Sequence, residues 1–354
     1  MIRKTTVVTV LMVVACVSLS SFAAVYRTSA IEAVRSKTVL SSSDLRVIDE
    51  FVENAVKDVS QTRDFTVVAA DRAFLLGYTS KQGQYAQQFS ESAHKHIAAA
   101  LKQAATFPQD RAFKSILNVL ILVDGLNDAS LVDLAYNYLS DDREPIAYWA
   151  VRIATSKAVL DVVTQDPSTK QGQEVISKLK GITPKSSPEI LGVISRFAVG
   201  LQGLDGEELL NSIADLRITR YEKGLVKNEI IDAGILKGLC AKIELNTSSK
   251  AMVATRFSQL YSYVIQRYAK GQAVFSRRQQ QNMRSVIAEI EEKCLTKLLV
   301  DSPSRLKRAL ELNDVSSLMT EHDRVFGGPN TAGTLPSKLQ FIYETGSTSP
   351  KRLP

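Results

Sequence analysis

The chain is poor in glycine and proline, the residues that most often make turns. It has 17 glycines and 10 prolines among 354 residues, whereas these two residues together make up roughly 12% of an average protein. Because a fold of many short strands needs such turns at close intervals, the deficit favours helices. Hydrophobic residues (45%) and charged residues (23%) are near the globular average, so a wholly disordered or collagen-like chain is excluded.

Residues that bind metals or act as catalytic bases are also scarce. The only histidines are His94, His96 and His322. His94 and His96 are two positions apart on an expected helix, whereas two histidines that share a metal would be three or four apart. A Gly-x-Ser-x-Gly elbow is absent, and neither Cys240 nor Cys294 has a histidine nearby in the sequence. We therefore expect no metal, no cofactor and no catalytic residue, that is, a protein that is not an enzyme.

The chain has no large excess of charge of either sign. Lysine and arginine number 44 against 37 acidic residues, which gives a net charge of +7. A dedicated nucleic-acid-binding protein usually concentrates a larger basic excess on one surface, so we expect no nucleic acid partner. The balance suits a soluble protein that contacts an acidic partner.

The first 25 residues are typical of an export signal. Two basic residues precede an uncharged run over residues 5–25, which is the pattern of a secretory signal peptide. Three outcomes remain open: cleavage after Ala23, retention of residues 5–25 as a membrane anchor, or lipidation of Cys16 in a stretch that resembles the lipobox of bacterial lipoproteins. Each outcome places the folded part outside the cytoplasm, whether periplasmic, extracellular or anchored at the membrane.

From residue 44 onward the apolar residues recur with the period of a helix. One stripe includes Ile48, Val52 and Val59, and another includes Met283 and Ile287. Residues spaced by three and four lie on one face of a helix. We predict an all-α fold of antiparallel helix pairs, stacked as an α-solenoid or packed as an irregular bundle.

The sequence predicts four segments. Residues 1–25 are the signal peptide or anchor, 26–43 a linker, 44–325 a helical repeat-like domain and 326–354 a disordered tail. The tail is rich in glycine, proline, serine and threonine. Such a composition buries too little apolar surface to offset the entropy lost on ordering.

Residues 127–163 carry the clearest repeat-like pattern. An apolar helix over residues 131–139 is followed by an acidic turn at 140–144 and then by a second, alanine-rich helix. This stretch resembles a HEAT repeat, in which such a turn precedes a proline, an aliphatic residue and a stripe of alanines. The matching residues are Pro145, Ile146, Trp149, Ala150 and Ala154. Ala147 stands where that family usually has arginine. The resemblance implies an α-solenoid of closely packed helix pairs.

Cys240 and Cys294 both lie on expected apolar helix faces. Two buried free thiols are one interpretation, because unpaired cysteine is among the most buried residue types. In an exported protein a disulfide between them is the other. The disulfide requires two helices to bring their Cα atoms within about 4.4 to 6.8 Å of each other.

The helix expected near residues 250–270 carries a basic face beside its apolar stripe. The residues of this face and the basic residues that follow it are Arg256, Tyr263, Arg267, Lys270, Arg277 and Arg278. Cations around an aromatic side chain can bind phosphates or acidic groups. We predict that this basic stripe contacts an acidic partner; a merely solvated helix face is the alternative.

These features predict an exported, non-catalytic helical scaffold that binds another protein or an anionic component of the cell envelope. The alternative is a helical enzyme that acts on an envelope or glycan substrate through carboxylates that meet only in three dimensions, such as Asp141, Asp142 and Glu144. Paired carboxylates about 5 to 10 Å apart in a deep cleft would favour the enzyme.

Overall fold

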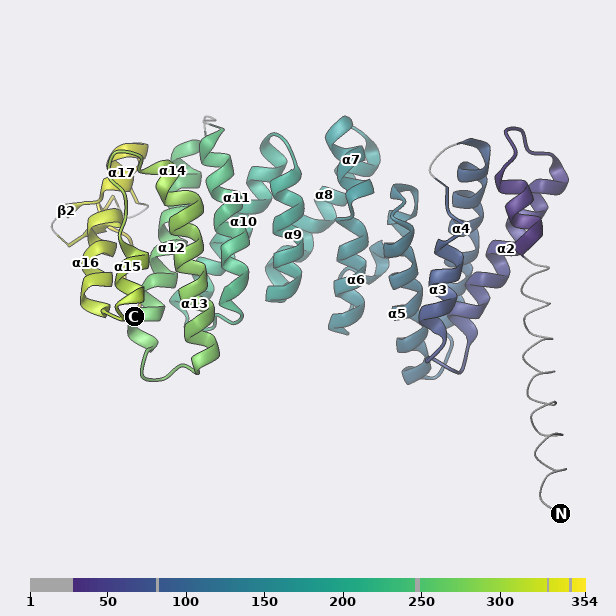
Figure 1. The fold of residues 1–354 in the computed structure, drawn as a ribbon, viewed down its shortest axis with the longest axis horizontal. Coiled ribbons are helices and arrows are strands. Elements are labelled where there is room, and N and C mark those ends of the chain that lie inside the picture. The colour runs from purple at the N-terminus through teal and green to yellow at the C-terminus, as the bar shows by residue number, and fades with distance from the viewer. Residues whose placement is uncertain (1–27, 81–82, 246–248, 330, 344–345) are drawn as a thin grey trace, which may run out of the picture. The chain divides into compact units, whose positions relative to one another are not determined.

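The computed structural model describes residues 28–80, 83–245, 249–329, 331–343 and 346–354. Contacts divide the chain into two compact units that meet in sequence at Ile153 and Ala154. The predicted all-α fold is confirmed, because helices form nearly all of the regular structure in each unit (Figure 1). The expected export signal, with Cys16 and the cleavage site, lies outside the described residues.

The N-terminal unit consists of helices joined by short links. Its elements are α2 (Ser42–Gln61), α3 (Val68–Leu76), α4 (Gly83–Ala104), α5 (Gln109–Leu126), the 3-10 helix η1 (Ala129–Tyr138) and α6 (Glu144–Ala154). Helices α2, α4 and α5 pack against one another (Figure 1). The predicted stripe of Ile48, Val52 and Val59 is fully buried. Residues 28–35, inside the expected linker, are helical, and their Ile31 and Val34 are buried as well.

The repeat-like stretch contains one 3-10 helix and one α-helix. Its first helix is η1 and not the α-helix that the sequence predicts, and Asp128 caps it by accepting a hydrogen bond from the Ser130 N–H. The second helix, α6, begins at the predicted place, with Pro145 in its first turn. Ile146 and Ala150 have no exposed surface, so α6 buries the face that the pattern indicates.

The C-terminal unit is a larger helical assembly. Its helices, in chain order, are α7 (Lys157–Gln165), α8 (Lys170–Ile182), η2 (Thr183–Lys185), α9 (Pro188–Gly200), α10 (Leu204–Glu222), η3 (Glu229–Ile231), α11 (Asp232–Glu244), α12 (Lys250–Gly271), α13 (Arg277–Ile290), the π-helical η4 (Glu291–Leu295), α14 (Thr296–Leu298), α15 (Leu306–Glu311), α16 (Val315–Phe326) and α17 (Thr334–Leu339). Helix α12 packs against α10, α11, α13, α16 and α17. It is therefore the central helix of the unit.

A buried ion pair joins α10 to α11. The Arg217 guanidinium donates to the Asp232 carboxylate at 2.7 and 2.9 Å, and neither side chain has any exposed surface. Tyr221 also donates its hydroxyl to Asp232, at 2.7 Å. A buried charge is tolerated only when it is paired and hydrogen-bonded, so this cluster holds the two helices in one arrangement.

Within the expected tail, the structure describes residues 327–329, 331–343 and 346–354. They contain a two-residue antiparallel ladder between β1 (Gly327–Gly328) and β2 (Thr331–Ala332), followed by α17. Phe341, Tyr343 and Leu353 are buried, and the Tyr343 hydroxyl donates to the Phe326 carbonyl at 2.9 Å. These described residues are held in place by a few buried apolar side chains and by partners that the helices supply for the backbone.

Candidate functional site

The basic stripe of α12 faces acidic residues of its own chain. Arg256 donates to the Asp215 carboxylate at 2.7 and 2.9 Å. The Tyr263 hydroxyl donates to Glu222 at 3.0 Å. The two acidic residues are seven positions apart on α10, as are their partners on α12. Because equal spacings match in the same direction, α10 and α12 run parallel, with α11 between them in sequence.

Arg267 continues this pairing at the next acidic residue. Its guanidinium donates to Glu229 at 2.9 Å and stacks on the Phe275 ring at 4.6 Å. Arg256, Tyr263 and Arg267 therefore lie against acidic residues of their own chain and do not form a solvated face, and contact with an acidic partner stays a prediction. Tyr263 is fully buried, and the two arginine side chains are only 17% and 16% exposed. A signal for this existed in the sequence, because the acidic partners recur at steps of seven along α10 and η3.

The remaining basic residues have different surroundings. The Lys270 Nζ donates to the backbone carbonyls of Leu353 and Pro354, at 2.5 and 3.1 Å. Arg277 and Arg278 begin α13 and are exposed. The six predicted interaction residues thus do not share one surface: three lie in an interface between helices, one binds the end of the chain and two lie on solvent.

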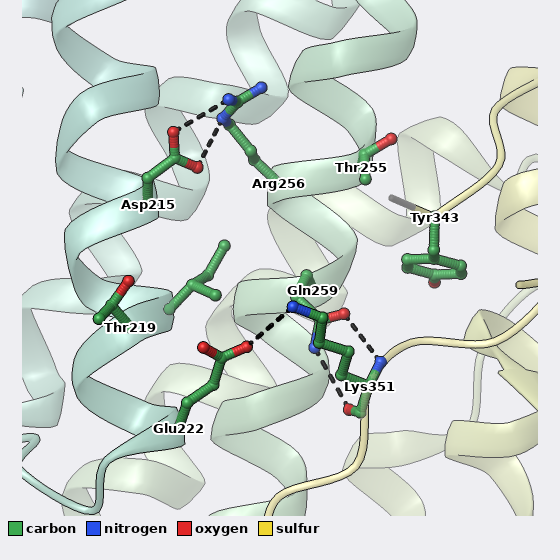
Figure 2. A pocket seen from close by; sticks show the side chains of 9 residues that line it. Asp215, Thr219, Glu222, Thr255, Arg256, Gln259, Tyr343 and Lys351 are labelled. Atoms are coloured by element: carbon green, nitrogen blue, oxygen red, sulfur yellow. Dashed lines mark hydrogen bonds and ion pairs between the residues drawn. The ribbon is translucent and has the colours of Figure 1, made fainter. Parts of the chain in front are cut away.

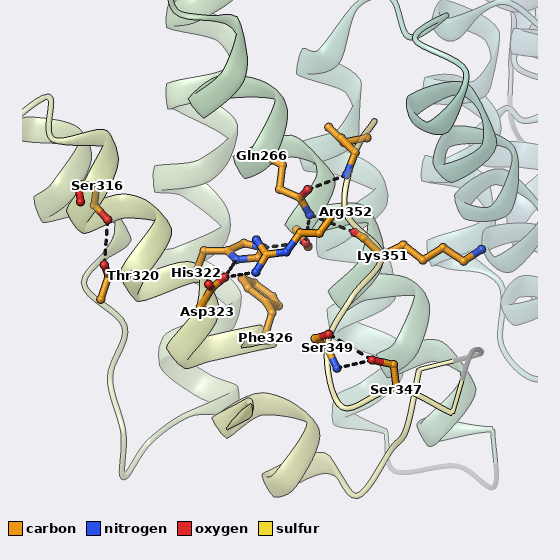
Figure 3. A network of polar contacts seen from close by, with 12 residues as sticks. Gln266, Ser316, Thr320, His322, Asp323, Phe326, Ser347, Ser349, Lys351 and Arg352 are labelled. Atoms are coloured by element: carbon orange, nitrogen blue, oxygen red, sulfur yellow. Dashed lines mark hydrogen bonds and ion pairs between the residues drawn. The ribbon is translucent and has the colours of Figure 1, made fainter. Parts of the chain in front are cut away.

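Residues 347–354, which we call the C-terminal strap, lie along α12 (Figure 3). The Gln259 side chain accepts from the Lys351 N–H at 2.9 Å and donates to the Lys351 carbonyl at 3.3 Å. Gln266, two helical turns further on, donates to the same carbonyl at 3.1 Å and accepts from the Leu353 N–H at 2.8 Å. Side-chain amides thus replace the partners that a strand or helix would give this backbone.

The side chains of the strap bind different walls of the same surface. The Lys351 Nζ lies 3.3 Å from Glu222 of α10, and Arg352 donates to Asp323 of α16 at 2.6 Å. Leu353 is 9% exposed. Each of the two adjacent basic residues therefore has its own acidic partner on the helices, and the aliphatic residue after them is buried.

A pocket of about 180 Å³ lies beside the strap (Figure 2). It is lined by Asp215, Ile218, Thr219 and Glu222 of α10, by Thr255, Arg256 and Gln259 of α12, and by Tyr343 and Lys351. Its two carboxylates are engaged by cations of the same pocket, Asp215 by Arg256 and Glu222 by Lys351. Such pairing is typical of structural ion pairs and not of the general acid that glycan cleavage needs.

A serine, a histidine and an aspartate are hydrogen-bonded in series, and Figure 3 shows the histidine and the aspartate beside Arg352 of the strap. Ser262 Oγ lies 2.7 Å from His322 Nε2, and His322 Nδ1 lies 2.7 Å from Asp323. This is the order of contacts in a serine hydrolase, and sequence reasoning missed it because Ser262 and His322 are 60 positions apart. Burial lowers the pKa of His322, and both Ser262 and His322 are fully buried.

The surroundings of Ser262 do not suit a nucleophile. It lies in the middle of α12, where the backbone N–H groups donate within the helix and cannot bind an oxyanion. Gln266 donates to its hydroxyl at 2.8 Å. The series is therefore best understood as a buried polar network that connects α12, α16 and, through Arg352, the strap.

Cys240 of α11 and Cys294 of η4 are both buried, and their thiols are hydrogen-bonded to each other. The hydrogen bond to Cys294, together with burial, raises the pKa of Cys240, whereas the same bond lowers the pKa of Cys294. Both thiols are free in the structure. The two thiols therefore lie close enough to interact, and the disulfide itself stays a prediction.

The other two histidines bind separate acidic residues. His94 lies 3.0 Å from Asp133 of η1, and His96 lies 2.9 Å from Asp49 of α2. They therefore point toward different elements, as the spacing of two predicts. Within the described ranges, no group of three or more metal-ligating side chains is placed to hold an ion.

The carboxylates of the acidic turn before α6 are not brought together as a catalytic pair. Asp141 accepts two hydrogen bonds from the Arg143 guanidinium, at 2.8 and 2.7 Å, and one from its backbone N–H at 2.9 Å. Glu144 and nearby Pro145 are exposed at the start of α6, as is Asp142. The turn is therefore closed by the contacts between Asp141 and Arg143.

No known protein family matches the chain, and no curated protein shows significant similarity to it. None of the helices in the described part of the chain is both long and apolar enough to cross a membrane.

Proposed function

We propose that this chain is a non-catalytic helical scaffold that binds a segment of another protein on the surface formed by α10, α12 and α16. The observation that carries this proposal is the binding of the strap backbone by Gln259 and Gln266. A glutamine amide that both donates to and accepts from a peptide backbone can bind an extended chain whatever its side chains. The C-terminal unit already holds a peptide segment in this way, with its own chain as the ligand.

We further propose that the folded part acts outside the cytoplasm. The basic start and the uncharged run over residues 5–25 support export. A protein partner is favoured over an anionic envelope surface, because acidic residues of the chain neutralise Arg256 and Arg267. Cell fractionation with N-terminal sequencing tests export; recovery of the intact chain in the soluble cytoplasm would refute it.

We also propose that residues 127–163 are a divergent HEAT-like helix pair. The buried Ile146 and Ala150 of α6 support this, as does the turn that Arg143 ties to Asp141. The 3-10 geometry of η1 is the divergent part. The pair supports a scaffold built from stacked helices, in which binding surfaces form along rows of neighbouring helices.

A serine hydrolase is the second candidate, because Ser262, His322 and Asp323 have the contacts of a catalytic triad. A fluorophosphonate probe, which labels activated serines, separates the two functions. The scaffold predicts no labelling above that of Ser262→Ala. Labelling of the parent at Ser262 that this variant abolishes would establish the hydrolase and overturn the non-catalytic assignment.

Photo-crosslinking in native cells tests the binding surface. A photoreactive residue replaces Met252, which is 48% exposed on α12, and in a matched control replaces Val39, which is 73% exposed in the N-terminal unit. We expect a crosslinked partner protein at position 252 and none at position 39. Equal crosslinking at both positions, or none at either, would contradict a binding surface on α12.

A further inference from the structure

We infer that the C-terminal strap is an internal ligand that closes a peptide-binding groove, and that the partner carries an extended segment with two adjacent basic residues followed by an aliphatic residue. This inference rests on the proposed function and specifies the ligand. The groove is the surface of α12 bearing Gln259, Gln266 and Lys270, with Glu222 on one side and Asp323 on the other.

The contacts separate into those that recognise a backbone and those that recognise side chains. Gln259, Gln266 and Lys270 bind backbone N–H and carbonyl groups, which every peptide has. The acidic residues bind Lys351 and Arg352 individually. The first set would hold any extended segment, whereas the second selects two consecutive cations.

The strap is held by contacts that another chain can replace. The side chains of Lys351 and Arg352 are 45% and 39% exposed, so their ion pairs exchange with water and contribute little individually. Beneath the strap lie the polar side chains of Ser262, Gln266 and His322. Water can satisfy these groups when the strap leaves. An open groove is therefore an accessible state.

Attachment to the same chain makes the strap a strong competitor. A ligand tethered a few residues from its binding site has an effective concentration on the order of 1 mM. If the groove binds a separate strap peptide with a Kd of about 100 µM, the strap closes the groove in about nine molecules of ten. The closed chain then binds the same peptide about tenfold more weakly than an open one.

The test uses the full chain and a fluorescent peptide of the strap sequence, Ser-Thr-Ser-Pro-Lys-Arg-Leu-Pro. The variant Lys351→Glu/Arg352→Glu places like charges opposite Glu222 and Asp323, and both positions are exposed, so the fold is kept. Fluorescence anisotropy should show binding to this variant about tenfold tighter than to the parent. Equal, or absent, binding by parent and variant would overturn the inference.

Two controls identify the contacts. A peptide with Glu-Glu in place of Lys-Arg should not bind the opened chain. A chain opened by Lys351→Ala/Arg352→Ala has no strap charges to pair with position 222. Adding Glu222→Lys to it should weaken binding of the Lys-Arg peptide and strengthen binding of a Glu-Arg peptide, whereas an unchanged preference would refute side-chain recognition. If the parent is a dimer and the opened variant is a monomer, the strap of a second copy occupies the groove. That result would refute the proposal that a segment of another protein binds there.

These results are independent of the test in cells. Peptide binding uses a defined probe and needs no native partner. Failure of the peptide together with a specific crosslink at position 252 would refute the strap as ligand and leave the scaffold function intact. Peptide binding without any crosslink would refute the cellular binding function alone.

Discussion

Replacing Asp232 with alanine is expected to destabilise the C-terminal unit strongly. In the parent, Arg217 and Asp232 form a two-point ion pair with no exposed surface on either side chain. In the variant, the Arg217 guanidinium stays buried, and the neutral Lys227 carbonyl, at 3.0 Å, remains as its partner. It also removes the acceptor of the Tyr221 hydroxyl.

The size of the effect follows from the burial of the pair. Removing one partner of a buried ion pair typically costs about 3–5 kcal/mol, because the other charge remains desolvated. Removing both should cost much less, since the desolvation penalty disappears with the charges. We therefore expect Arg217→Met/Asp232→Leu to be more stable than Asp232→Ala. A surface control is Asp161→Ala, because the Asp161 side chain is 49% exposed and its partner Lys157 is 76% exposed. Its loss should cost under about 1 kcal/mol.

Urea denaturation monitored by circular dichroism gives the free energies, and hydrogen exchange assigns them to a unit. In the Asp232→Ala variant, the backbone amides of α10 and α11 should lose protection from hydrogen exchange, whereas those of α2 and α4 should keep it. A cost below about 1 kcal/mol for Asp232→Ala would refute the reasoning. So would a double variant that is as unstable as the single one.

Three further predictions concern other parts of the molecule. Ala150→Asp should destabilise the chain by about 3 kcal/mol or more, because it buries an unpaired carboxylate at a position with no exposed surface; an unchanged melting temperature would refute the packing of α6. Burial lowers the pKa of His322 below its ordinary value of 6.5, so the unfolded chain binds the proton more readily and stability should fall as the pH drops below 6.5. Urea midpoints at pH 7 and pH 5 should show this loss, and His322→Gln should reduce it; the same pH dependence in both proteins would contradict the assignment. Mild oxidation should link Cys240 to Cys294, which are already in contact, and add up to about 4 kcal/mol of stability. Mass spectrometry that finds both thiols free after oxidation would reject the link.

Much of the helical structure could be predicted because its signals are local. Met283 and Ile287 recur at helical spacing and are fully buried, and Pro188 occupies the first turn of α9. Apolar periodicity and helix starts depend only on neighbours within one or two turns. The 3-10 geometry of η1 was not predictable in this way, since apolar residues three positions apart, such as Val132 and Ala135, fall on one face of either type of helix.

The candidate site was less predictable because its contacts join distant segments. The basic stripe was identified in the sequence, but two of its acidic partners, Asp215 and Glu222, lie on α10. The stripe therefore lies between two helices and not on the surface. The strap was expected to be disordered from its composition. Its order comes from Gln259 and Gln266, which lie 92 and 87 positions from the backbone groups they bind.

The sequence by itself determined the helical class, the buried stripes and the two cysteines that could meet, because each depends on residue type and on spacing along one helix. Only the tertiary structure decided which charges are neutralised, which serine meets which histidine and where the last residues bind. Those outcomes depend on the relative placement of helices. Helical periodicity says which face of a helix is apolar, but not which other helix covers that face or which polar side chains it brings.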